Sequence, residues 1–353
     1  IPLSAGNDSR LVASALKHLG ATNVKCYSYG SMGNFEAKIA EIIAKKLGYE
    51  WMFVPLNYKS EKKYYASQDY KEYAKFSETY CSIPYIQSLS TIKYLKDMKW
   101  VNEDAFFVNG NSGDFISGAH INLLKDNDCN SKAQRKENIL NNLINKHFSL
   151  WGHYKTEKNV EKIKNSLWNE IVLACGNDLK NKEKDHLFYE YSEFIDRQSK
   201  YVIAGQRVYE FYGYEWRMPL WDNEYLYFWQ KVPVEFKKNQ KLYSDMLKKK
   251  NFGNVWGDDI LVNKKNITPK WVIPFRLLVK VFFSLFGNYG KTSWKQFDKV
   301  VFNYWMINTH TMKAFSYLRV LSDFNKKPRG ISPCWSSDDY VSKLKLKSIK
   351  STK

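Results

Sequence analysis

The feature that most restricts the fold of this chain is a pattern that recurs in its first 120 residues: an apolar run, a turn, then a helical segment. The helical part is clearest over Asn34–Leu47, because its Ile and Leu residues fall on one face and Gly48 follows as a stop signal. Strands that alternate with helices form parallel sheets, and ligands bind at the carboxyl ends of those strands. The predicted strands are Ile1–Leu3, Val24–Tyr29, Trp51–Leu56 and Ala105–Val108.

The patterns along the whole chain predict an α/β fold in four regions. They are a nucleotide-binding α/β core at 1–122, a helical insertion at 123–184, a helical completion of that domain at 185–250, and a basic helical region at 251–353. Only three residues precede the first turn, whereas a strand that presents such a turn needs about five. We therefore expect that sequence upstream of Ile1 has been trimmed.

The positive charge is concentrated in the last third of the chain. The formal net charge is +19, and from Lys231 onward 25 Lys and Arg face only 8 Asp and Glu. Such a surplus suits nucleic acid, an anionic membrane surface or a phosphorylated substrate, or it is simply a solvated lysine face.

Cysteine usage indicates the compartment. The five cysteines include no CxxC pair, and none has a histidine at metal-ligand spacing. An odd count in a long chain argues against a disulfide framework, and no signal peptide opens the sequence. We therefore expect a cytoplasmic protein.

The apolar segment Lys270–Gly287 is too short to span a bilayer and is interrupted by charge. On a helix, Arg276, Lys280 and Ser284 would form one polar stripe on an otherwise apolar surface. This pattern suits a helix in a membrane interface, and it also suits a helix docked on the core of its own domain. Docking is the favoured interpretation, with peripheral membrane contact at the inner membrane face left open.

Two turns of small residues carry the candidate chemistry. Ser4–Ser9 lies where the first predicted strand passes into a helix, so its backbone N–H groups can approach phosphates. Gly110–Asp114 follows the fourth predicted strand and would lie at the same sheet edge. Asp8 and Asp114 could together hold a Mg²⁺ that accompanies pyrophosphate.

A third segment, Tyr214–Asp222, places three charged residues among apolar ones. We predict that Glu215, Arg217 and Asp222 form a buried charged network.

In their order and spacing these three segments, SAGNDS, GNSGDFISGAH and EWRMPLWD, resemble the synthetase domain of the asparagine synthase family. The resemblance covers about Ile1 to Lys250. It implies a PP-loop ATP pyrophosphatase fold: a parallel sheet with flanking helices. It also implies a two-step reaction, in which a carboxylate is adenylated by ATP and an amine or ammonia then displaces AMP to give an amide.

The resemblance also implies residue roles. Pyrophosphate would bind at Ser4, Gly6, Asp8 and Ser9; Mg²⁺ at Asp8 and Asp114; and AMP at Leu3, Tyr29 and Gly110.

The sequence departs from the family pattern at the acceptor side. Asn111 and Phe115 replace two acidic residues of the second turn, and Ser244 stands where the family has a lysine. We expect Lys241, one turn earlier, to act catalytically in its place. Ile86 or Gln87 stands where the family has an arginine, which makes aspartate a doubtful substrate.

These features predict an ATP- and Mg²⁺-dependent amide ligase. Its acceptor would be a small-molecule carboxylate, such as a sugar acid in surface-polysaccharide synthesis, with ammonia supplied by a glutaminase domain or partner. Asparagine synthesis proper and a non-catalytic nucleotide-binding module are the alternatives. Nucleic-acid modification is not expected, because RNA-binding domains and cysteine pairs are not apparent.

Overall fold

The computed structural model describes residues 1–121, 131–176, 179, 181–260 and 268–343. Near the chain start, β1 (Lys25–Gly30) and β2 (Glu50–Pro55) pair in parallel, with Cys26 opposite Trp51. Pro2 forms a parallel bridge to Tyr27, so the first residues lie beside β1 as a short strand. This part of the predicted strand–helix alternation is confirmed.

The predicted fourth strand pairs with a segment that the sequence did not identify as a strand. β3 (Phe106–Val108) runs parallel to β4 (Glu215–Arg217), about a hundred residues further along the chain. Within the described residues the strands therefore form two separate pairs, not one sheet of four successive strands. Local pattern predicts that a strand forms, but distant packing decides which strand it pairs with.

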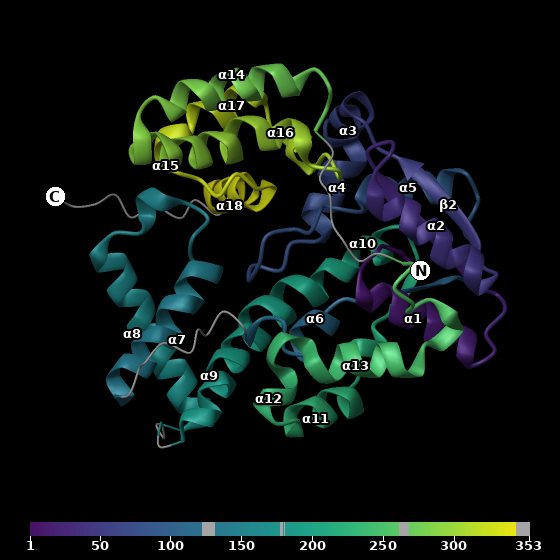
Figure 1. The fold of residues 1–353 in the computed structure, drawn as a ribbon. Coiled ribbons are helices and arrows are strands. Elements are labelled where there is room, and N and C mark those ends of the chain that lie inside the picture. Colours follow the sequence, from purple (N-terminus) through teal and green to yellow (C-terminus); the bar gives the residue numbers. More distant parts are fainter. Residues whose placement is uncertain (122–130, 177–178, 180, 261–267, 344–353) are drawn as a thin grey trace.

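Helices make up most of the remainder (Figure 1). Those of the predicted core region are α1 (Asn7–His18), α2 (Phe35–Leu47), α3 (Tyr58–Tyr65), α4 (Gln68–Phe76), α5 (Leu89–Asp97) and α6 (Gly113–Ile116). Those of the insertion are α7 (Lys132–His147), η2 (Gly152–Tyr154), α8 (Glu157–Cys175) and η3 (Lys182–Lys184).

The later helices continue in the same order along the chain. Up to residue 254 they are α9 (Asp185–Ser192), η4 (Glu193–Ile203), η5 (Ala204–Gln206), α10 (Arg207–Phe211), η6 (Pro219–Trp221), α11 (Asn223–Lys231), α12 (Val234–Lys237), η7 (Lys238–Gln240), α13 (Lys241–Lys250) and η8 (Phe252–Asn254). The C-terminal group consists of α14 (Val272–Ser284), α15 (Gly287–Phe297), η9 (Asp298–Phe302), α16 (Asn303–Met306), η10 (Thr311–Ala314), α17 (Tyr317–Ser322), η11 (Phe324–Lys326) and α18 (Ser332–Lys343).

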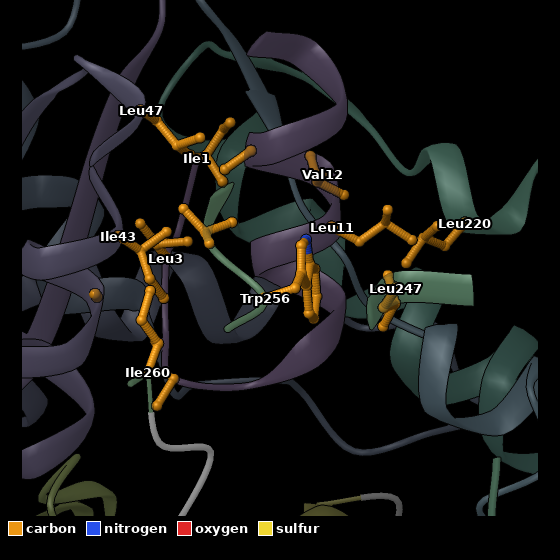
Figure 2. Close-up of a cluster of buried hydrophobic side chains, with 14 of the residues drawn as sticks. Ile1, Leu3, Leu11, Val12, Ile43, Leu47, Leu220, Leu247, Trp256 and Ile260 are labelled. Carbon is orange, nitrogen blue, oxygen red and sulfur yellow. The ribbon is translucent and has the colours of Figure 1, made fainter. Parts of the chain in front are cut away.

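One apolar core surrounds the first loop and its helix. Figure 2 shows Leu11 and Val12 of α1 close to residues from distant parts of the chain, including Leu220 and Leu247. Trp256 and Ile260 belong to the same core, so packing of this unit extends past the predicted boundary at residue 250. The boundary was predicted too early because the sequence becomes basic before the residues of this core end.

The insertion and the C-terminal group have cores of their own. Helices α7 and α8 of the insertion pack with α9, which lies past the predicted end of the insertion at residue 184, around residues such as Leu143 and Ile171. The C-terminal core is built around Trp335, and Trp151, between α7 and α8 of the insertion, packs against it with ring centroids 5.7 Å apart.

Helix α14 docks on the C-terminal group through one face. Val272 is fully buried, and Arg276 turns inward to form two hydrogen bonds, of 2.6 and 2.8 Å, to the carboxylate of Asp298. The predicted polar stripe is therefore partly an internal ion pair. No helix in the described part of the chain combines the length and apolarity that crossing a membrane requires.

Candidate active site

A cleft of 1160 Å³ contains both small-residue loops. Its walls come from the loops after the first strands, from η4, from the end of α7 and from the C-terminal group. Every residue that the sequence predicted to contact ATP or Mg²⁺ lines this cleft: Leu3, Ser4, Gly6, Asp8, Ser9, Tyr29, Gly110 and Asp114.

The first loop ends at a half-buried helix start. Helix α1 begins at Asn7 with Gly6 as its N-cap, no side chain caps it, and its first residues line the cleft. Ser4 and Ser9 hold the loop closed, with their hydroxyl oxygens 3.1 Å apart. The N–H of Gly6 donates to Ser4 Oγ at 3.1 Å. A helix start of this kind binds anions.

Arg10, which is buried, holds the Ser4–Ser9 loop in place through its guanidinium group. Its guanidinium is 1% exposed and donates to the carbonyl oxygens of Ala5, at 3.0 Å, and Val255, at 3.1 Å. The group also lies 5.0 Å from the centroid of the Trp256 ring. Burial lowers the pKa of Arg10 to about 10, so it remains charged at neutral pH.

The second loop lies directly against the first. The backbone N–H of Asp114 donates to Asp8 Oδ2 at 2.9 Å. A Cβ atom on Gly110 would lie 2.5 Å from the backbone carbonyl carbon of Asp8, and one on Gly113 would lie 2.6 Å from Asp8 Cγ. Only glycine allows this approach, which brings the two aspartates together.

Each aspartate is also held by a second partner. Tyr243 of α13 donates its hydroxyl proton to Asp8 Oδ1 at 2.9 Å. Asp114 Oδ1 accepts the N–H of Phe115 at 2.8 Å, and Oδ2 lies 3.3 Å from Nε2 of His120. Burial raises the pKa of Asp114, but His120, the N–H of Phe115 and the charge of Arg197 together lower it below its usual value.

Behind His120 lies a buried carboxylate that the sequence did not reveal as a site residue. Glu193 is 0% exposed and opens η4, which has π-type winding. Its Oε1 lies 3.0 Å from His120 Nδ1, and its Oε2 lies 3.0 Å from Lys146 Nζ and 2.9 Å from His147 Nε2. Arg197 donates to Oε1 at 3.3 Å. Burial opposes ionisation, but the surrounding cations lower the pKa of Glu193 well below its usual range.

The contacts from Asp114 to His120 and from His120 to Glu193 therefore connect the second loop to η4. Burial acts to lower the pKa of His120, but its two carboxylate neighbours, Asp114 and Glu193, raise that pKa overall.

The residues present fit Mg²⁺ held together with phosphate. Within the described residues no group of three or more His, Cys, Asp or Glu could enclose a metal by itself. Two carboxylates on adjoining loops are what Mg²⁺ uses when substrate phosphates and water complete its shell.

Lys241, predicted to act catalytically, does not line the cleft. It is the exposed first residue of α13, and its Nζ lies 5.9 Å from the centroid of the Phe236 ring. The orientation of α13 is set by Tyr243 and Leu247, which are buried against the first core. This packing turns Lys241 outward.

The prediction that Glu215, Arg217 and Asp222 form a buried charged network is wrong. Arg217 pairs with Glu215 at 2.9 Å, but their side chains are 57% and 68% exposed. Both lie on β4, where residues two apart project to the same face. Asp222 is separate and caps α11 by accepting the N–H of Glu224 at 2.9 Å.

The comparisons with known proteins agree with this geometry. The family model described as asparagine synthase matches residues 1–266. The chain belongs to the asparagine synthase family. At the level of the family it is therefore an ATP-dependent amide ligase domain. No curated protein matches the chain.

Two positions at which this asparagine synthase family member departs from the family pattern line the cleft. Gln87 lines the cleft and donates to the Tyr29 hydroxyl at 3.2 Å, whereas Ile86 is buried in an apolar cluster. Gln87 is thus the residue that faces the cleft where the family arginine is expected. Asn111 also lines the cleft, and Ser244 does not.

Sequence reasoning missed the cationic wall of this family member's cleft. Lys146, Arg197, Lys200 and Arg329 all line it, yet they come from the insertion, η4 and the C-terminal group. The one local signal was Glu193 with Arg197 four residues later on a helical segment, a spacing that also occurs on ordinary helix surfaces.

Proposed function

We propose that this chain activates a carboxylate with ATP as an acyl-adenylate and transfers ammonia or an amine to it. The observation that carries the proposal is the meeting of Asp8 and Asp114 at one cleft wall, beside the uncapped start of α1. An arrangement of this kind suits a PP-loop nucleotide site, in which phosphates lie against a helix start and a metal lies between carboxylates.

In this proposal, pyrophosphate lies against Ser4, Gly6 and Ser9, and AMP lies along Leu3, Tyr29 and Gly110. Asp8 and Asp114 would hold Mg²⁺, which when bound neutralises phosphate charge and favours departure of pyrophosphate. The contacts from Tyr243 and His120 keep the two carboxylates in place, so the site needs little rearrangement on binding.

The reaction has two displacement steps. A carboxylate oxygen of the acceptor attacks the α-phosphorus of ATP, and the bond from that phosphorus to the oxygen bridging it to the β-phosphate breaks, releasing pyrophosphate. The amine nitrogen then attacks the acyl carbon, the bond to AMP breaks, and one proton leaves the nitrogen. The residues of the cleft contribute mainly orientation and fixed charge.

Arg197 takes the role that the sequence suggested for Lys241. It lines the cleft, its side chain is 38% exposed, and its charge helps to lower the pKa of Asp114. A guanidinium at this place can contact a phosphate through two N–H groups.

We further propose that the acceptor is a carboxylate larger than aspartate, such as a sugar acid of surface-polysaccharide synthesis. Gln87 carries no charge to hold an α-carboxylate, and the cleft is large for a single amino acid beside ATP. Aromatic rings pack on the apolar faces of sugars, and four tyrosines line the cleft: Tyr29, Tyr85, Tyr201 and Tyr209. Ammonia would come from a glutaminase domain or partner.

Pyrophosphate release measured with ATP, Mg²⁺ and ammonia tests the proposal. We expect release with a uronic-acid sugar, little with aspartate, and a loss of about a hundredfold in Arg197→Gln. Lys241→Gln, the matched control, should release pyrophosphate at the wild-type rate. Release with aspartate alone would mean plain asparagine synthesis. ATP binding without release for any carboxylate would favour a non-catalytic module, a reading that Asn111 and Ser244 also support.

A further inference from the structure

Helices α14 and α15 form a hairpin at the outer edge of the C-terminal group (Figure 1). The inner face of α14 consists of Val272, Arg276, Val279 and Phe283, which recur at helical spacing. Phe283 packs on Trp294 and Phe297, with ring centroids 6.2 and 5.4 Å apart. These contacts fix the orientation of α14 about its axis, and they leave the opposite face outward.

The outward face of α14 is almost entirely apolar. Leu278 is 68% exposed and Leu285 is 76% exposed, although soluble proteins rarely leave large side chains of this kind together at the surface. The exposed apolar residues of α14, of the residues that flank it and of the first turn of α15 are together called the α14 face: Trp271, Ile273, Phe275, Leu277, Leu278, Val281, Phe282, Leu285, Phe286 and Tyr289.

Positive charge borders the α14 face, and no acidic residue lies near it in the sequence. Between residues 260 and 298 the sequence has seven Lys and Arg and no Asp or Glu. Lys270, Lys280 and Lys291 are exposed. The first acidic residue that follows, Asp298, is already paired with Arg276.

We propose that the α14 face lies in the interfacial region of an anionic lipid bilayer. Its apolar side chains would enter the boundary between headgroups and acyl chains, while the bordering lysines meet anionic headgroups. Trp271 and Tyr289, at the two ends of the face, are residue types that concentrate at this depth. The 13-residue α14 lies along the surface and does not cross it.

Charge favours a bilayer over a second copy of the chain. A symmetric dimer through this face would bring the same surface of each copy together. Lys270, Lys280 and Lys291 of both copies would then crowd around one interface that offers no carboxylate from this segment. Like charges at an interface oppose association, whereas an anionic membrane supplies the missing countercharge.

Vesicle flotation of the whole chain tests the proposal. We expect binding to phosphatidylcholine vesicles that contain phosphatidylglycerol, and weaker binding to phosphatidylcholine alone. The triple variant Leu278→Gln, Phe282→Gln, Leu285→Gln replaces exposed residues, so it should fold and bind ATP like wild type. Its partition onto anionic vesicles should fall about tenfold or more.

A matched control uses exposed leucines away from α14. Leu19 and Leu173 are 79% and 89% exposed, and Leu19→Gln with Leu173→Gln should bind vesicles like wild type. Equal binding of the triple variant and wild type, or no binding of wild type, would overturn the proposal. If sedimentation instead shows a wild-type dimer that the triple variant loses, without vesicle binding, the face joins two copies and the bilayer assignment is wrong.

Discussion

The backbone N–H of Asp114 donates a 2.9 Å hydrogen bond to the carboxylate of Asp8 and joins two loops that lie about a hundred residues apart in the sequence. This contact places both carboxylates at one wall of the cleft, next to the start of α1. It is possible only because Gly110 and Gly113 present no side chain to Asp8.

Gly110→Ala should separate the two loops. The added methyl group would lie 2.5 Å from the backbone carbonyl carbon of Asp8, so one loop has to move. Overpacking of this kind costs about 1–3 kcal/mol, and we also expect ATP affinity to fall. Urea unfolding and calorimetry measure the two effects. Gly257→Ala is the control, because its new methyl group meets only the end of the exposed Asp259 side chain. Unchanged ATP affinity in Gly110→Ala would count against the loop contact.

Glu193→Gln should destabilise the fold strongly. The variant leaves Lys146, His147 and His120 without the buried carboxylate that balances them. Removing one partner of a buried ion pair costs about 3–5 kcal/mol. Urea unfolding should show this loss, whereas Glu103→Gln at an exposed position should change stability little. If Glu193→Gln lowers the free energy of unfolding no more than Glu103→Gln does, Glu193 does not balance the charges of Lys146, His147 and His120.

Stability should rise with pH above neutrality because of Lys313. Its Nζ is enclosed by the rings of Tyr58, Tyr304 and Trp305, with His310 nearby, and burial lowers the pKa of Lys313 to about 7. Between that value and 10.5 the unfolded chain binds a proton that the folded chain does not, so unfolding becomes harder as pH increases.

Lys313→Met removes the cause of this pH dependence. The variant should be more stable than wild type at pH 7, and the difference should shrink by up to about 1.4 kcal/mol per pH unit toward pH 9. The free energy of unfolding of both proteins is measured by urea unfolding at several pH values. A difference between them that stays constant from pH 7 to pH 9 would contradict the lowered pKa of Lys313.

Arg217→Ala should change stability very little. Its pair with Glu215 is more than half exposed on both sides, and exposed pairs contribute about 0–1 kcal/mol. A fall in stability of several kcal/mol, measured by urea unfolding, would mean that the pair is shielded in solution.

The phosphate-side loops could be predicted because their signals are local. Ser4–Ser9 and Gly110–Asp114 are turns of small residues that follow apolar runs, and the order of the motifs also indicated the family. The two loops meet as predicted, although the strands that precede them belong to separate pairs within the described residues.

The cationic wall and the orientation of α13 could not be predicted in this way. His120 follows α6, Lys146 lies on α7 and Glu193 opens η4, so they meet only in the folded chain and no local spacing reveals them. A catalytic role for Lys241 was predicted because it lies one turn before Ser244. The burial of Tyr243 and Leu247 then decided which face of α13 turns toward the cleft.

The measurement that most directly tests the account is calorimetric titration of ATP with Mg²⁺ into wild type, Asp8→Asn and Asp114→Asn. The substitutions keep the shape of each side chain but remove a charge from the proposed metal site. We expect wild type to bind and each variant to bind at least about tenfold more weakly, with a smaller difference when Mg²⁺ is omitted. Equal affinity in all three proteins would contradict the assignment of this cleft to ATP and Mg²⁺.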